Sequence, residues 1–316
     1  MKNLLSSLIL AALALPAIQA QERFQQEAYI ITGGGEAEQV WIADSNKIEF
    51  LYFETEQGVD PKKMRIAQPE AIWLIEPPAY TEAMELFQGR KYEEALKKFQ
   101  EVRETYRKLL ELPDNHSSLS AFYAMECLRH LGRLDDLAKA EESFLPDDRN
   151  SLTRPYHQSQ LEFFTMWMAV RAKDWSRLEI IAREYLAKNI PGYQRAQAGY
   201  CLGLALEGLK RPIEAINAYN IAMTADTGAS EVITADAALN ALRLYTEDKD
   251  VQLAIKFHGT PDEDPHFVGA LRLKEAASLA SLFELTLGGG KALPANFKDL
   301  LKYLPDEVKA EAKEEK

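Results

Sequence analysis

The sequence predicts a mainly α-helical protein, in which an α-α superhelix of paired helices follows a small β-barrel-like domain. Two observations support this prediction. Residues 25–75 alternate apolar and polar side chains in short runs that end at turn residues, a pattern typical of β-strands. After Pro77-Pro78, apolar residues recur at the three- and four-residue spacing of amphipathic helices, in about five similar segments.

The composition indicates a folded protein and excludes some kinds of partner. At 316 residues, 47% of them hydrophobic, the chain is long enough to bury a sizeable core. Its 37 Lys and Arg residues stand against 49 Asp and Glu, a formal charge of -12. Because nucleic acids and anionic membranes repel such a protein, we expect neither as its main partner.

Residues 1–20 have the pattern of a secretory signal peptide. Lys2 precedes an apolar run from Leu4 to Leu15, and small residues lead to a cleavage point before Gln21. The run is shorter than the roughly 20 residues of a membrane span, and no Cys marks a lipoprotein. We therefore expect a periplasmic or secreted protein with no integral membrane segment in the mature chain. A eukaryotic secretory signal would look similar.

Residues 21–76 are predicted to form the small β module. Gly33-Gly34-Gly35 would make a hairpin turn, since no helix with a Gly-Lys-Ser/Thr ending follows to complete a phosphate loop. The end of the module, RIAQPEAIWLIEPP, resembles the close of an SH3-like or Sm-like barrel. The candidate strands are Glu27 to Thr32, Gln39 to Ala43, Lys47 to Glu54, Lys63 to Ala67 and Ile72 to Ile75.

Residues 77–258 are predicted to form five helical pairs. The turns within them are marked by Tyr92, Leu134, Trp175, Pro212 and Val251, separated by 42, 41, 37 and 39 residues. Polar insertions such as LPDNH, LPDDRNSLT and DTGAS would connect the pairs as loops. The segments are Ala79 to Leu112, Ser117 to Phe144, Pro155 to Lys188, Arg195 to Ala225 and Glu231 to Phe257.

The fourth segment shows the pattern of two paired amphipathic helices most clearly. Leu202, Gly203 and Leu206 line one face of its first helix, and Ala215 and Tyr219 recur on the second. These residues, together with KYEEALKKF in the first segment, resemble the tetratricopeptide repeat (TPR) family, whose period is about 34 residues. The resemblance implies a superhelical binding scaffold with lengthened loops.

The remaining residues close the array. Residues 259–304 are predicted to form capping helices, from His266 to Leu287 and then in NFKDLLKYL, with a Gly288-Gly289-Gly290 hinge between them. Such helices would cover the apolar face of the last pair. Residues 305–316 are charged, lack core residues and are predicted to be a flexible tail.

No motif of established chemistry is present, so the sequence predicts neither an enzyme nor a cofactor. Cys127 and Cys201 fall in first helices two pairs apart, too far for a disulfide, and are predicted to be buried thiols. One segment of nine residues could hold a divalent metal, but Pro261 and Pro265 favour an inter-helix loop. Its candidate ligands are His258, Asp262, Asp264 and His266.

Candidate binding residues come from aligning the pairs by their turns. Four aromatic residues then occupy one equivalent place in successive first helices, and Trp167 lies one turn further along the third of them. In the TPR family this place faces the concave groove, so the resemblance implies an aromatic stripe there. Aromatic residues at helical spacing are also typical of a core, which stays an open alternative. The four residues are Tyr80, Phe122, Phe163 and Tyr200.

These observations favour a scaffold that binds a protein or peptide partner in the groove. An alternative is a cell-envelope structural or assembly protein, whose β module contacts cell wall or glycan while the repeats oligomerise. A hydrolase in the groove is a third hypothesis, because glycosidases that use paired carboxylates have no short motif.

Overall fold

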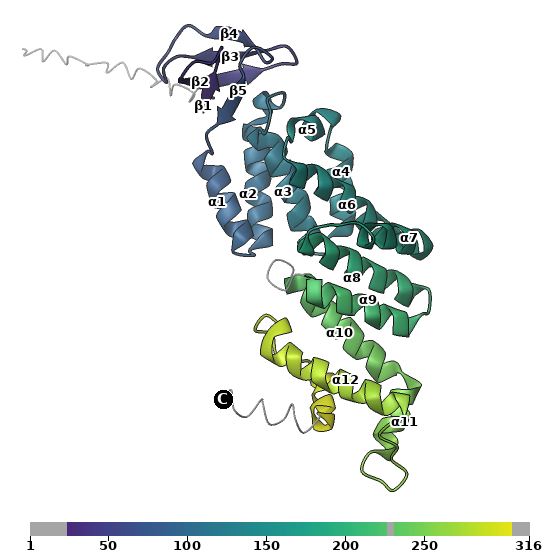
Figure 1. The fold of residues 1–316 in the computed structure, drawn as a ribbon. Coiled ribbons are helices and arrows are strands. Elements are labelled where there is room, and N and C mark those ends of the chain that lie inside the picture. The colour runs from purple at the N-terminus through teal and green to yellow at the C-terminus, as the bar shows by residue number, and fades with distance from the viewer. Residues whose placement is uncertain (1–23, 226–230, 305–316) are drawn as a thin grey trace, which may run out of the picture. The chain divides into compact units, whose positions relative to one another are not determined.

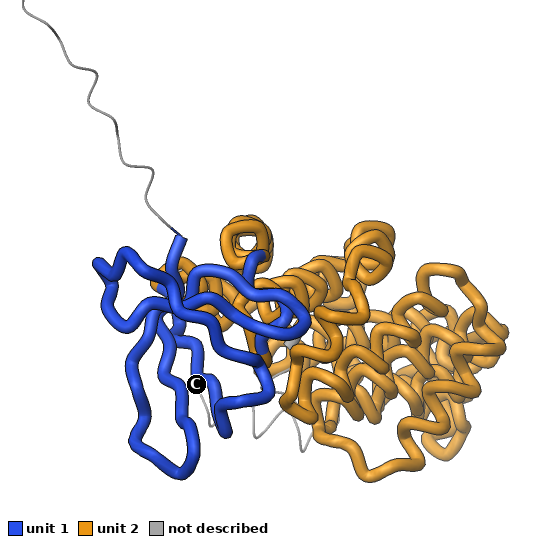
Figure 2. The backbone as a smooth tube through the Cα atoms, turned by 90° about the horizontal axis from the view of Figure 1, so that it is seen from above, with its two compact units in different colours: residues 1–77, 108–112 blue, residues 78–107, 113–316 orange. Residues whose placement is uncertain are grey.

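The computed structural model describes residues 24–225 and 231–304. The predicted signal peptide, the DTGAS insertion and the charged tail lie outside these residues. The chain divides into two compact units, one ending at Pro77 with the addition of Lys108–Leu112, and the other comprising the rest (Figure 2). The first is a small antiparallel sheet and the second is helical (Figure 1).

Five strands form one antiparallel sheet in the order β4-β3-β2-β1-β5. Alternate residues of β1 are buried, which is the alternation that the sequence predicts. β4 and β5 are the sheet edges, and no strand pairing joins them within the described residues. The strands are β1 (Gln26–Ile31), β2 (Ala37–Ser45), β3 (Glu49–Phe53), β4 (Lys62–Arg65) and β5 (Ala71–Leu74).

The glycine triplet makes the β1–β2 hairpin, as predicted. Gly33 and Gly34 have φ angles of 59° and 71°, in the left-handed region that glycine adopts without strain. The backbone N–H of Gly34 donates to the Glu70 carboxylate at 2.8 Å. This contact ties the hairpin to the turn that precedes β5.

A short helical segment from the predicted first repeat belongs to the sheet unit instead. Lys108–Leu112, which begins within a 3-10 turn (Arg107–Leu109), clusters with the sheet. The Ser45 hydroxyl of β2 donates to the backbone oxygen of Lys108 at 2.9 Å. The sheet unit therefore includes a piece of chain from beyond the predicted boundary at residue 76.

The helical unit consists of consecutive helices packed side by side (Figure 1). All five predicted pairs are present, and the second helices of the first four begin at the predicted turn residues. The pairs are α1 (Pro78–Gln88) and α2 (Tyr92–Thr105); α3 (His116–His130) and α4 (Leu134–Ser143); α6 (Pro155–Ala172) and α7 (Trp175–Leu186); α8 (Gly192–Gly208) and α9 (Pro212–Ala225); α10 (Glu231–Glu247) and α11 (Lys249–Phe257).

The first four turns share one backbone feature. The residue two positions before each second helix has a positive φ angle, although only Gly132 among them is a glycine. Lys173 is in the left-handed conformation, at φ 54° and ψ 30°, which ends α6. The other two residues are Arg90 and Lys210.

One predicted loop is a helix instead. In LPDDRNSLT, α5 (Pro146–Ser151) begins with a proline and two acidic residues, all favourable in a first helical turn. The Asp148 carboxylate accepts hydrogen bonds from the Leu145 N–H at 3.0 Å and from the Ser118 hydroxyl at 2.9 Å. The prediction of a loop was wrong because Asp148 and Ser151 are buried and hold the segment in place, while Pro146, Arg149 and Asn150 stay exposed.

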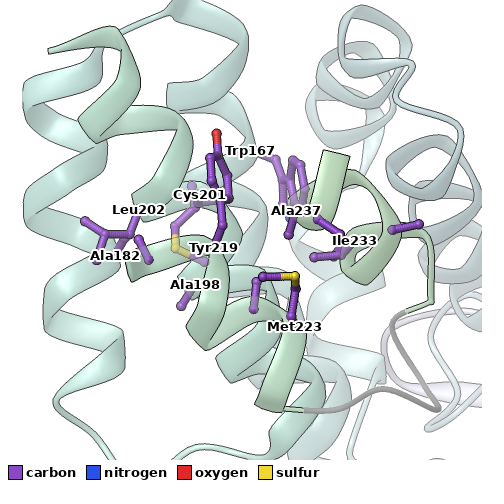
Figure 3. Packing of buried hydrophobic residues seen from close by; sticks show 14 of the residues in the cluster. Trp167, Ala182, Ala198, Cys201, Leu202, Tyr219, Met223, Ile233 and Ala237 are labelled. Atoms are coloured by element: carbon purple, nitrogen blue, oxygen red, sulfur yellow. The ribbon is translucent and has the colours of Figure 1, made fainter. Parts of the chain in front are cut away.

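The core of the helical unit lies between the helices of each pair and those of the next. Gly203 of α8 lies at a close crossing with α9, because a Cβ atom there would overlap the Tyr219 ring. Cys201 lies in the same core (Figure 3), and both it and Cys127 are free and buried, as predicted. Burial raises the pKa of the Cys201 thiol to about 12.

The array ends in α12 (Val268–Leu282), which continues into a π-helical turn (Phe283–Leu287). The predicted glycine hinge follows, where Gly289 and Gly290 have positive φ angles, and a 3-10 helix (Ala295–Tyr303) packs back on α12. Among the described helices, none has the combination of length and apolar character that crossing a membrane requires.

Candidate functional site

The aromatic residues that the sequence singles out are mostly in the core. Tyr80, Phe122, Phe163 and Trp167 are all buried, and Tyr200 is partly buried. They come from the first helices α1, α3, α6 and α8, as predicted. They do not form one exposed stripe, because their rings pack against neighbouring helices.

Two of these rings pack on histidines of the next pair. The Tyr80 ring lies 4.9 Å from that of His116, and the Phe122 ring lies 4.7 Å from that of His157. Burial lowers the pKa of His116 to about 4 and also lowers the pKa of His157. Both imidazoles are therefore neutral at neutral pH and serve as part of the packing.

Phe163 packs within its own pair, with its ring 4.3 Å from that of Tyr185 on α7. Trp167 and Tyr200 are brought together across α6 and α8, with ring centres 6.2 Å apart. This pair differs from the other predicted residues because both side chains line a cavity.

The cavity has a volume of about 170 Å³ and is bounded by the first helices of four successive pairs. We call the surface formed by α3, α6, α8 and α10 the first-helix face. Side chains from four helical pairs therefore line one cavity. Its lining residues are Arg129, His130, Leu131, Gly132, Trp167, Tyr200, Val232, Ile233 and Asp236.

Two of the lining residues, Arg129 and Trp167, belong to a buried polar cluster. We call this cluster the inter-helix network: Glu126, Arg129, Gln160, Trp167 and Gln197. Arg129 donates to both oxygens of Glu126, at 3.0 and 2.7 Å, within α3. The Gln160 amide of α6 donates to Glu126 at 3.0 Å, which connects two helical pairs. Burial without such partners would cost several kcal/mol for each charge, so the network is a required part of this core.

The network continues into α8. The amides of Gln160 and Gln197 donate to each other at 3.2 Å in both directions. The Trp167 indole N–H donates to the Gln197 oxygen at 3.0 Å. This bond fixes the Trp167 ring, and Arg129 lies 5.9 Å from the ring centre.

His130 completes the wall of the cavity. A guanidinium can only donate, so the Arg129 contact at 2.8 Å makes the His130 Nε2 an acceptor. Burial, together with the nearby Arg129 and Arg90 charges, lowers the pKa of His130 to about 2. The imidazole is therefore neutral and carries its proton on Nδ1.

Asp236 supplies the cavity with a carboxylate. It projects from α10, is exposed, and has no hydrogen bond or ion pair with another described residue. Although the residue reaches solvent, protein atoms around its carboxyl group remove part of its hydration, and this desolvation raises the pKa of Asp236, while the charge of Lys291 acts in the opposite direction. An unpaired carboxylate beside two aromatic rings is suited to contact a cation.

The candidate metal ligands do not meet. Within the described residues, no three His, Cys, Asp or Glu side chains gather closely enough to hold a metal ion. His258 instead contacts the Glu263 carboxylate at 3.0 Å. His258, Asp262 and Asp264 line a second cavity, at α11 and α12, whose remaining lining is largely apolar.

Sequence reasoning missed the inter-helix network and Asp236. The sequence did contain a signal for the network, because Gln160 and Gln197 are 37 residues apart, the same separation as the turn residues Trp175 and Pro212. They therefore occupy equivalent positions in adjacent repeats. A polar residue repeated on the apolar side of two helices indicates a buried hydrogen bond between them.

No protein-family model matches the chain, and neither a curated protein nor a solved structure shows a significant match to it.

Proposed function

We propose that this protein is a TPR-like scaffold, periplasmic or secreted, that binds a protein or peptide segment along its first-helix face. In this proposal the helical pairs form an α-α superhelix and the first-helix face lines its concave side. The observation that carries the proposal is the cavity at Trp167 and Tyr200, to which four successive pairs contribute. A surface shared by several repeats suits an extended ligand, which contacts each repeat in turn.

The proposed role is non-catalytic. Glu126, the carboxylate closest to the network's arginine, already accepts hydrogen bonds from Arg129 and Gln160. The two thiols are buried, and burial raises the pKa of each. These groups are engaged in packing and in hydrogen bonds, so they favour a rigid binding surface over general acid-base or nucleophilic chemistry.

The test compares the two sides of one helical pair. Tyr200→Glu places a charge on the first-helix face, whereas Ile213→Glu alters an apolar residue of α9 that is 37% exposed. Purified full-length chain is used to retain partners from an envelope extract, and retained proteins are identified by mass spectrometry. We expect Tyr200→Glu to lose a defined partner that Ile213→Glu and the parent retain. Equal retention by all three chains would contradict a binding role for this face.

A second candidate function rests on the outer face of the sheet. Trp73 of β5 is 63% exposed and pairs with Tyr29 of β1, whose other neighbour is Gln39. Trp41 lies on the same face, across from Glu27. A row of aromatic rings beside hydrogen-bonding groups is suited to stack on sugar rings, which favours glycan or cell-wall contact by the sheet.

Sedimentation with cell-wall sacculi tests this second candidate. Trp73→Ala should remove most of the binding. Ile48→Ala, at a residue that is 67% exposed and lies outside the strands, should not. If the parent chain stays in the supernatant, the sheet has no cell-wall role.

A further inference from the structure

We propose that the cavity of the first-helix face binds a positively charged side chain, a lysine or arginine of the partner segment. This inference rests on the proposed function, since it names the group by which a bound peptide would be recognised. It depends on Asp236, Tyr200 and Trp167, which line the cavity together.

The first argument is the charge of the cavity. Two of its lining residues carry a full charge, Arg129 and Asp236. Arg129 is neutralised, because both Glu126 oxygens accept from it at 3.0 and 2.7 Å. Asp236 has no such partner among the described residues. Lys291 acts on Asp236 through its charge but does not line the cavity. The carboxylate is thus the one charge of the lining without a hydrogen-bonded or ion-paired partner among the described residues, and a cationic ligand would pair with it.

The second argument is the aromatic wall. The rings of Trp167 and Tyr200 are 6.2 Å apart, and the faces of such rings attract cations. The Trp167 ring already has one guanidinium, that of Arg129, 5.9 Å from its centre. A wall of this kind favours an ammonium or guanidinium group over a carboxylate.

The third argument is the end of α3. Leu131 and Gly132 follow its last residues and line the cavity, so the negative end of the helix dipole is directed toward this region. The net charge of the whole chain, -12, adds a long-range attraction for basic partners. The end of the α3 dipole and the net charge of the chain therefore both favour a positively charged ligand.

The size of the cavity limits the occupant to one side chain. Its volume of about 170 Å³ is close to that of an engineered protein cavity of about 150 Å³ that holds a benzene molecule. A folded domain would not enter it. A single lysine or arginine of an extended segment would, with the rest of the segment running across the first-helix face.

The experiment selects ligands without assuming their sequence. A phage-displayed library of random peptides is selected on immobilised full-length chain, and binders are retested with Tyr200→Glu to keep those that use the first-helix face. We expect these to share a lysine or arginine. Replacing that residue by norleucine, or introducing Asp236→Asn, should weaken binding about tenfold or more. Asp236→Lys should reverse the preference toward acidic peptides.

The matched control is Glu94→Gln, which neutralises an exposed carboxylate of α2 and should leave affinity unchanged. Melting curves of all variants check that they fold. Binders that use this face through an acidic or apolar residue, with affinity unaffected by Asp236→Asn, would overturn the inference while the proposed function stands. If no selected peptide depends on Tyr200, the proposed function fails and the inference fails with it.

Discussion

Single glycines and lysines determine how closely the helices of a pair can pack and turn. In the fourth pair, Gly203 faces the Tyr219 ring, and the Tyr219 hydroxyl donates to Glu207 at 3.1 Å. The ring is therefore held from both ends and cannot easily move aside. The close crossing depends on the absence of a side chain at residue 203.

We predict that Gly203→Leu lowers the free energy of unfolding by roughly 1–3 kcal/mol or more, because the added side chain overpacks the α8–α9 contact. Urea denaturation measures the change. Asn217→Leu, on the exposed side of α9, is the control and should stay within about 0.5 kcal/mol of the parent. Equal stability of the two variants would mean that α8 and α9 do not cross at Gly203.

At Lys173 we predict a substitution that raises the free energy of unfolding instead of lowering it. Its left-handed conformation costs an L-residue roughly 1 kcal/mol, and a glycine avoids this cost. Since the Lys173 side chain is exposed, we expect Lys173→Gly to raise the free energy of unfolding by up to about 1 kcal/mol. Lys97→Gly, in the interior of α2, should lower it by about as much. A lower stability for Lys173→Gly would show that its side chain contributes to the turn.

At the scale of the helix, polar residues at equivalent positions join neighbouring pairs. Glu126, Gln160 and Gln197 lie on α3, α6 and α8, and each is hydrogen bonded to the next. A buried polar network specifies one register, because a shifted helix would leave its groups unpaired. The histidines His116 and His157 lie 41 residues apart, the separation of the turn residues Leu134 and Trp175, and repeat in the same manner.

Removing one partner of the network should be costly. We expect Glu126→Gln to lower the free energy of unfolding by about 3–5 kcal/mol, because it leaves the Arg129 charge buried without its counter-ion. The double variant Glu126→Leu/Arg129→Met should lose much less, since neither charge remains. Chemical denaturation of both variants distinguishes the two cases. Similar losses in the single and double variants would mean that packing rather than charge makes the network necessary.

The buried histidines predict a loss of stability in acid. An unfolded histidine binds a proton near pH 6.5, whereas folded His116 does so only near its lowered pKa of about 4. Between these values the unfolded state holds more protons, so stability falls as pH falls. We expect the melting temperature to drop from pH 7 to pH 5 and His116→Gln to reduce that drop. His266→Gln, at an exposed residue, should leave it unchanged.

At the scale of the whole molecule, the helical pattern predicted more of the structure than of the site. In the first four pairs the turn residues mark where the second helix begins, because a left-handed residue two positions earlier ends the first helix. The same spacing could not tell whether a ring is buried, since a first helix is covered on several sides. Tyr80 and Tyr200 occupy equivalent positions, yet one is buried in the core and the other lines a cavity.

Contacts between distant segments were also beyond the reach of local patterns. Glu126 and Gln197 belong to one network only because Gln160 of the pair between them bridges both. Asp236 resembles any exposed acidic residue in the sequence, and its place beside Tyr200 follows from the packing of α8 on α10. Such sites depend on tertiary packing, which cannot be read from the local patterns of a single sequence.

The division into two units gives the last prediction. The sequence alone suggests that a fragment starting at Ile75 should be helical and soluble. However, Leu109 and Leu112 are fully buried and belong to the unit that contains the sheet. Without the sheet, these two leucines would meet water. We therefore expect the fragment to keep its helical circular dichroism but to self-associate.

The cause of that association can be tested directly. Leu109→Ser/Leu112→Ser in the same fragment should restore a monomer in analytical ultracentrifugation, because it removes the newly exposed apolar surface. Leu253→Ser, at a residue of α11 that is already 42% exposed, is the control and should leave self-association unchanged. A fragment that is monomeric without any substitution would show that Lys108–Leu112 is covered well enough by the helices alone.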